Sequence, residues 1–184
     1  MLSSAAKEYL KVYGVLVGKK PLIFTNNDSG YETAIEFKKN GVDPIILDTR
    51  KDPKSEIIDE AKKLDIQIKF SYVVVAAKGY KKVKSAEVAK ISDDKNELGT
   101  LEIINCDCIC VSGFWTPTIH LASQSGNKTT FNKDIDAFVP GLSKQNETTL
   151  GAANGTFTLE ETLKNSFESG YQISKKITNN DNKT

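Results

Sequence analysis

The chain has 184 residues, of which 39% are hydrophobic, and a formal net charge of +1 at pH 7. This length suits one or two small domains, and the nearly balanced, interspersed charges predict neither a nucleic acid partner nor attraction to an anionic membrane. No segment approaches the roughly 20 apolar residues of a membrane span, so we expect a cytoplasmic protein without a membrane partner.

Helices and strands alternate in the first part of the predicted structure. The run 44–48 is continuously apolar, as expected for a parallel strand covered on both faces. Amphipathic patterns and turn residues around it predict a βαβαβ order preceded by a short helix. The predicted elements are a helix at 3–13, a strand at 21–25, a helix at 29–40 capped by Gly41, a strand at 44–48, a helix opened by Pro53 and a strand at 66–70.

Three further strands then follow without helices between them. Only turn-like segments at 78–82 and 92–97 separate the runs at 72–77, 83–89 and 98–104, which predicts an antiparallel meander. A short strand at 108–111 comes next. This order is that of the pyridine-nucleotide domain in flavoproteins of the glutathione-reductase type. We therefore predict an α/β fold, a Rossmann-like NAD domain with a parallel sheet and a three-strand meander.

The turn after the first strand has the shape of a dinucleotide-binding turn but lacks two of its three glycines. Thr25 and Asn27 take the first two positions, and Gly30 keeps the third, which allows close packing of helix and strand. The Asn27 side chain would project into the space of a pyrophosphate, and Asp28 adds a negative charge there. Asp48 is placed to bond a ribose hydroxyl. We expect this degenerate turn to be retained for folding and to be empty.

The three cysteines and the single histidine are the other residues that suggest chemistry. Cys106, Cys108 and Cys110 alternate along one strand, where a rise of about 3.3 Å per residue separates neighbouring thiols by roughly 6.6 Å. That spacing is too long for two thiolates on one zinc ion, so we expect small buried apolar residues without a metal or redox role. His120 has no nucleophile or carboxylate arranged with it, and no catalytic residue is predicted.

Three stretches of the sequence carry a resemblance to a known family. Phe24-Thr-Asn-Asn-Asp-Ser-Gly-Tyr-Glu-Thr-Ala34, the run at 111–126 around Phe-Trp-Thr-Pro-Thr-Ile-His, and Asp136-Ala-Phe-Val-Pro-Gly141 resemble the alpha subunit of heterotetrameric sarcosine oxidase. The resemblance covers most of residues 7–173. It implies a central fragment of a longer subunit, lacking the part that carries an intact glycine fingerprint and the C-terminal folate-type domain.

The resemblance implies a role in sarcosine catabolism within a flavoprotein complex. Members of that family oxidatively demethylate sarcosine to glycine, pass the one-carbon unit to tetrahydrofolate and form peroxide. FAD lies in the beta subunit, FMN at the contact of alpha and beta, and NAD in alpha, so the implied partners are beta, gamma and delta subunits. The alternatives are the alpha subunit of a related opine, proline or glycine-oxidising flavoenzyme, and a structural or interaction module without catalysis.

The resemblance also implies a cofactor contact in the last third of the chain. Gly151, Ala152, Gly155, Phe157 and Leu159 match positions that line NAD in the family, with the two glycines giving backbone access. The following helix would point its free N-terminal amides toward the cofactor. The expected domains are a degenerate Rossmann-like nucleotide domain at 1–118, the C-terminal part of the adjoining FAD-like fold at 119–173 and a disordered polar tail at 174–184.

Overall fold

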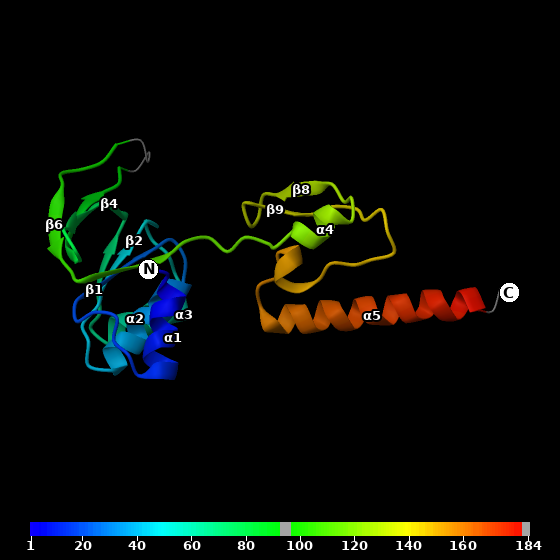
Figure 1. Cartoon of the computed structure of the whole chain (residues 1–184), viewed down its shortest axis with the longest axis horizontal. Coiled ribbons are helices and arrows are strands. Elements are labelled where there is room, and N and C mark those ends of the chain that lie inside the picture. Colours follow the sequence, from blue (N-terminus) through cyan, green and yellow to red (C-terminus); the bar gives the residue numbers. More distant parts are fainter. Residues whose placement is uncertain (93–96, 182–184) are drawn as a thin grey trace. The chain divides into compact units, whose positions relative to one another are not determined.

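A four-stranded parallel sheet organises the N-terminal part of the chain in the computed structural model, which describes residues 1–92 and 97–181 (Figure 1). The strand order is β3-β2-β1-β7, and every neighbouring pair is parallel. The predicted α/β fold with parallel strands is therefore confirmed. The strands are β1 (Pro21–Thr25), β2 (Ile45–Asp48), β3 (Gln67–Phe70) and β7 (Cys108–Ser112).

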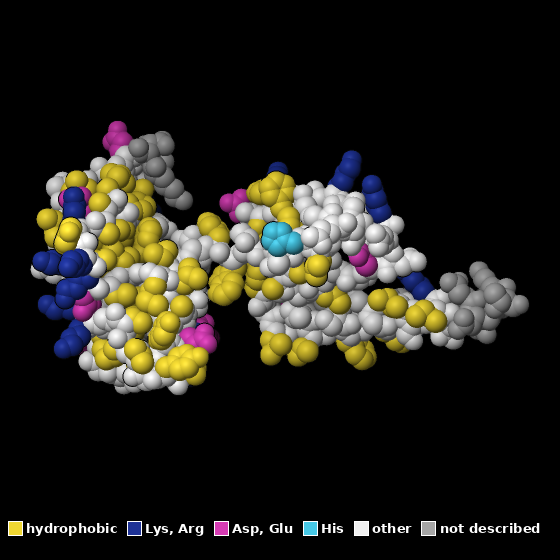
Figure 2. All heavy atoms as spheres, in the orientation of Figure 1, with side chains coloured by type: hydrophobic (Ala, Val, Ile, Leu, Met, Phe, Trp, Pro, Cys, Tyr) yellow, Lys and Arg dark blue, Asp and Glu magenta, His cyan; other side chains and the backbone are white. Residues whose placement is uncertain are grey.

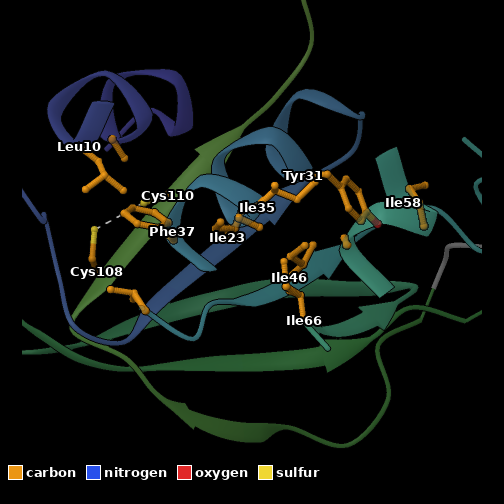
Figure 3. Packing of buried hydrophobic residues seen from close by; sticks show 14 residues of the cluster. Leu10, Ile23, Tyr31, Ile35, Phe37, Ile46, Ile58, Ile66, Cys108 and Cys110 are labelled. Carbon is orange, nitrogen blue, oxygen red and sulfur yellow. Dashed lines mark hydrogen bonds between the residues drawn. The ribbon is translucent and has the colours of Figure 1, made fainter. Parts of the chain in front are cut away.

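Helices cover one face of this sheet and a second sheet covers the other. Along β1, Ile23 packs among the helices, whereas Leu22 packs against the antiparallel strands, because successive side chains of a strand point to opposite faces. Figure 3 shows Ile23 and Ile46 of the sheet beside Phe37, Tyr31 and Ile58 of the helices. The continuous apolar run at β2 is explained by burial on both faces. The helices are α1 (Ser3–Tyr13), α2 (Ser29–Lys39) and α3 (Glu56–Lys63).

The predicted meander is present, with a shorter third strand than expected. Strands β4 (Tyr72–Gly79), β5 (Val83–Lys90) and β6 (Glu102–Asn105) pair antiparallel in that order. Leu98, the predicted start of the third strand, makes only an isolated bridge to Ile91. Residues 93–96 of the predicted turn at 92–97 lie outside the described residues.

The predicted start of the third helix was wrong by three residues. Pro53 lies in the loop before α3, and the extended residue Ser55 precedes the first helical residue, Glu56. The other helix ends agree with the sequence pattern. Gly14 follows α1 with a φ of 65°, and Gly41 follows α2 with a φ of 76°, so both ends use the left-handed backbone that glycine adopts readily.

The chain divides into two compact units, Met1–Phe114 and Trp115–Thr184. The second unit contains α4 (His120–Gln124), β8 (Thr129–Asn132), β9 (Ala137–Pro140), the 3-10 helix η1 (Gly151–Asn154) and α5 (Leu159–Asp181). Helix α5 includes residues 174–181, where the sequence predicts a disordered tail, because no proline or glycine interrupts the chain there. Residues 182–184 of that tail lie outside the described residues.

The longest of the described helices is α5. Even α5, the 23-residue helix, is too polar, and no other helix within 1–92 and 97–181 is both long and apolar enough to cross a bilayer.

Candidate functional site

The residues of the predicted dinucleotide turn meet at the carboxyl ends of three parallel strands. Thr25 ends β1, and it is in register with Asp48 at the end of β2 and with Ser112 at the end of β7. This edge is where open α/β sheets bind their ligands. The structure therefore brings Thr25, Asn27, Gly30 and Asp48 together at the edge of the sheet that the sequence indicates.

The side chain of Asn27 bridges both sides of this crevice. Its amide nitrogen donates to the carbonyl oxygen of Gly113, which follows β7, and to Oδ1 of Asn26 at 2.9 Å. Its oxygen accepts from the backbone N–H of Ser29 at 3.0 Å, from the Ser29 hydroxyl at 2.6 Å and from the Ser112 hydroxyl at 3.2 Å. The carboxamide thus binds the first turn of α2, whose amides would otherwise face a phosphate.

Gly30 and Thr25 are packed against each other. A Cβ on Gly30 would lie 2.6 Å from the Cβ of Thr25, so only glycine allows α2 to approach β1 this closely. The Thr25 hydroxyl donates to the carbonyl oxygen of Asn27 at 2.7 Å and accepts from its backbone N–H at 3.2 Å. Thr25 therefore holds the turn in the place of the usual first glycine.

Asp48 is completely buried, and its carboxylate is occupied by protein groups. The hydroxyl of Tyr31 donates to Oδ2 at 2.7 Å, and the Arg50 backbone N–H donates to Oδ1 at 2.9 Å. The guanidinium of Arg50 adds Nε and Nη2 contacts at 2.9 to 3.2 Å, and its Nη2 also lies 2.8 Å from Oδ1 of Asp28. A ribose hydroxyl would have to compete with all of these donors.

The two residues that the sequence reasoning missed in this crevice are Arg50 and Tyr31. Burial of Tyr31, followed by its hydrogen bond to Asp48, raises the pKa of its hydroxyl. Burial alone would lower the pKa of Arg50, but its hydrogen bonds to Asp48 and Asp28 raise it overall. The sequence does contain a signal for Arg50, because this arginine comes two residues after Asp48, the carboxylate at the end of β2. One network of hydrogen bonds and ion pairs at this edge of the sheet joins Asp28, Arg50, Asp48 and Tyr31.

The second set of candidate residues lies in η1, the loop after it and the start of α5. Gly151 is buried with a φ of 65°, Ala152 is exposed, and Leu159 is 73% exposed. The ring of Phe157 lies 6.5 Å from the ring of Trp115. A Cβ on Gly155 would come within 2.6 Å of the side chain of Ile135, so packing already requires glycine there. Backbone access to a cofactor at the two glycines stays a prediction.

The first turn of α5 is capped by its own side chains. The Thr158 hydroxyl accepts from the backbone N–H of Glu161 at 3.4 Å and donates to the Glu161 carboxylate at 2.9 Å, in the T-x-x-E spacing of a capping box. Glu160 and Glu161 place two carboxylates in this turn. Because these charges repel an anion, the helix end does not favour a diphosphate.

The three cysteines are buried, as predicted, but the predicted separation of the thiols was wrong for one pair. The sulfur atoms of Cys108 and Cys110 lie 3.6 Å apart (Figure 3), because side-chain rotation brings them closer than the rise of the strand suggests. The hydrogen bond from Cys110 lowers the pKa of Cys108 to about 7. Cys106 belongs to the core on the other face of the sheet. No group of three possible metal ligands occurs within the described residues.

The comparisons with known sequences agree with the family resemblance. No family model matches the chain. The chain is 30% identical to sarcosine oxidase subunit alpha of Corynebacterium sp. (strain P-1) over 165 residues. The aligned residues make up 89% of this chain and 17% of that subunit. Over 158 residues it is 35% identical to sarcosine oxidase subunit alpha of Rhizobium meliloti (strain 1021), 85% of this chain and 15% of that subunit. The chain spans about one sixth of the length of these curated relatives.

Solved structures share the fold at low sequence identity. Thioredoxin reductase of T. acidophilum has a TM-score of 0.55 at 15% identity, over 84% of this chain and 51% of that chain. The bacillithiol disulfide reductase of Staphylococcus aureus has a TM-score of 0.53 at 16% identity, over 76% of this chain and 47% of that chain. The chain is thus a relative of sarcosine oxidase subunit alpha over the matched segment, and it has the fold of the pyridine nucleotide-disulfide oxidoreductases.

Proposed function

We propose that the chain forms part of a cytoplasmic oxidoreductase subunit of the sarcosine oxidase alpha type. In this proposal the assembly demethylates sarcosine to glycine with FAD, FMN and NAD, in the company of beta, gamma and delta subunits. This chain contributes folding and assembly, and no catalytic residue. Residues 1–118 act as a degenerate nucleotide domain and residues 119–173 as the last part of an FAD-like fold.

The network of protein hydrogen bonds at the ends of β1, β2 and β7 is the observation that supports this proposal. Asn27 crosses the space of a pyrophosphate, and Arg50 takes the carboxylate of Asp48 that would hold a ribose. A buried and fully bonded carboxylate is not released without a large cost. The first unit therefore serves as a folded scaffold, and any NAD of the assembly belongs to the second unit, at Gly151, Ala152, Gly155, Phe157 and Leu159.

A purely structural module is the second candidate function. The capping box at Thr158 and the carboxylates of Glu160 and Glu161 favour it, because they leave the start of α5 poorly suited to a diphosphate. An alpha subunit that serves the oxidation of an opine, proline or glycine would contain the same folded segment. The folded segment therefore does not distinguish sarcosine from these other substrates, and sarcosine is proposed from the similarity to the two relatives.

Thermal unfolding with and without NAD tests the vacant crevice. A ligand present at 100 times its Kd stabilises the folded state by about 2.7 kcal/mol, which raises the Tm of a chain of this size by roughly 5 to 11 °C. We expect a shift below about 1 °C for this chain in millimolar NAD, because the Asp48 carboxylate and the Ser29 N–H at the start of α2 are already bonded to protein groups. A shift of several degrees that Asn27→Trp removes would contradict the vacant crevice.

Replacement of the matched segment of the Rhizobium meliloti subunit by this chain tests the assembly. With the other subunits of that oxidase present, we expect sarcosine-dependent peroxide formation and retained NAD. Ala152→Glu should lower the NAD content, whereas Asn154→Glu, also exposed in η1, should leave it unchanged. A chimera that assembles without NAD or activity would favour the structural module.

A further inference from the structure

Cys108 and Cys110 form a pair of free thiols in the core of the first unit. Both belong to the core cluster on the helix face of the parallel sheet, and Figure 3 shows their side chains turned toward each other. The two sulfur atoms lie 3.6 Å apart. The expectation that these cysteines have no redox role depends on a thiol spacing of roughly 6.6 Å. For this pair the observed distance removes that premise.

The backbone spacing of the pair is compatible with a disulfide bond. Alternate residues of a strand have Cα atoms about 6.6 Å apart, within the range of about 4.4 to 6.8 Å that disulfides span. Cys108 and Cys110 also leave the same face of β7, because both pack in the same cluster. A side-chain movement that brings the sulfur atoms closer by about 1.6 Å therefore reaches the bonding distance of about 2.05 Å.

The two thiols differ in their protonation. A hydrogen bond from the Cys110 thiol lowers the pKa of Cys108 to about 7, so about half of the Cys108 side chains are thiolates at pH 7. Reactive thiolates often have a histidine beside them, but the only histidine, His120, is on the surface of the second unit (Figure 2). The hydrogen bond to Cys108, followed by burial, raises the pKa of Cys110, which keeps its proton. Cys108 is thus the nucleophile of the pair.

Cys108 is also the more accessible of the two thiols. Its exposed fraction is 8%, against 0% for Cys110. The loop before β1 contacts Cys108 through a glycine: a Cβ on Gly18 would lie 2.8 Å from the Cβ of Cys108. This small exposure suits an oxidant of nearly the size of water, such as hydrogen peroxide.

We propose that hydrogen peroxide oxidises Cys108 and Cys110 to a disulfide within the chain, which makes the pair a reversible oxidation site. The Cys108 thiolate attacks one peroxide oxygen, the O–O bond breaks, and hydroxide leaves and takes up a proton as a sulfenic acid forms. The Cys110 sulfur then attacks the Cys108 sulfur, the S–O bond breaks, and the hydroxyl group leaves with the Cys110 proton as water. The two thiols lose two electrons, and peroxide is reduced to two molecules of water.

Counting the free thiols of the folded full chain tests the proposal. The reduced chain is treated with hydrogen peroxide at pH 7, catalase removes the excess, and the remaining thiols are alkylated in urea and counted by mass spectrometry. We expect one alkylated cysteine, Cys106, in place of three. Reduction with dithiothreitol should restore all three, because a disulfide is reversible whereas a sulfinic acid is not. Thiols are counted because peroxide also changes the total mass at Met1, the only methionine.

Cys110→Ala and Cys106→Ala are matched variants. Each keeps two cysteines at the same two-residue spacing in the sequence, but Cys106 and Cys108 pack in different core clusters on opposite faces of the sheet. In the folded state we therefore expect a disulfide in Cys106→Ala and none in Cys110→Ala. In urea, where only the sequence spacing matters, both variants should form one. Circular dichroism verifies that both variants are folded before the treatment.

Three results would overturn the proposal. They are three free thiols after treatment of the folded chain, equal disulfide formation in the two folded variants, and a sulfinic acid at Cys108 without a disulfide. Fragmentation of the unsubstituted chain locates the alkylated cysteine, so the test remains decisive even if a variant does not fold: any residue other than Cys106 would contradict the proposal. No sarcosine, NAD or partner subunit is present, so the outcome is independent of the tests of the proposed function.

Discussion

Replacement of Asn27 by alanine tests whether its carboxamide holds the degenerate turn together. The substitution leaves the Ser29 N–H and the Gly113 carbonyl without their side-chain partner. A net hydrogen bond contributes about 1 kcal/mol, and loss of a helix-start acceptor costs about the same, so we expect a loss of about 2 kcal/mol. For a chain of this size that corresponds to a decrease in Tm of roughly 4 to 8 °C.

Urea unfolding followed by far-UV circular dichroism measures this loss. Fluorescence is less suitable because the only tryptophan, Trp115, belongs to the second unit. Asn26→Ala is the matched control: the Asn26 side chain accepts a single hydrogen bond, from Asn27 at 2.9 Å, so its removal should cost less than about 1 kcal/mol. Equal losses for the two variants would refute the role assigned to the Asn27 network.

Two further predictions concern the packing glycine and the buried tyrosine. Gly30→Ala should destabilise the chain by about 1 to 3 kcal/mol in urea unfolding, because the new Cβ would lie 2.6 Å from Thr25, whereas Gly113→Ala, with no atom within 4 Å, should change little. A similar cost at both glycines would show that the helix does not need this close approach. Burial and the Asp48 hydrogen bond raise the pKa of Tyr31, so its contribution is complete below the unfolded pKa of about 10 and is lost as the pH rises above it. Urea midpoints measured from pH 8 to 11 should therefore fall less steeply for Tyr31→Phe, and parallel curves would contradict the assignment.

Local patterns in the sequence were sufficient for the core of the first unit. The apolar run of β2, the helical spacing of α2 and the glycine after it are properties of neighbouring residues, and each predicted element is present. Gly30 was identified as a packing residue because a strand, a tight turn and a helix in succession require a close approach. Burial of Cys106, Cys108 and Cys110 was predicted because free cysteine is commonly buried as a weakly hydrophobic residue.

Contacts between distant residues were decided only by the tertiary structure. The sequence indicated that Asn27 would obstruct a ligand, but its bond to the Gly113 carbonyl joins residues 86 positions apart. Tyr31 reaches Asp48 because α2 packs beside β2, and no spacing along the chain indicates that contact, whereas Arg50 follows Asp48 by two residues and its contact is local. Periodicity reports the direction of a side chain within its element, whereas its partners depend on how the elements pack.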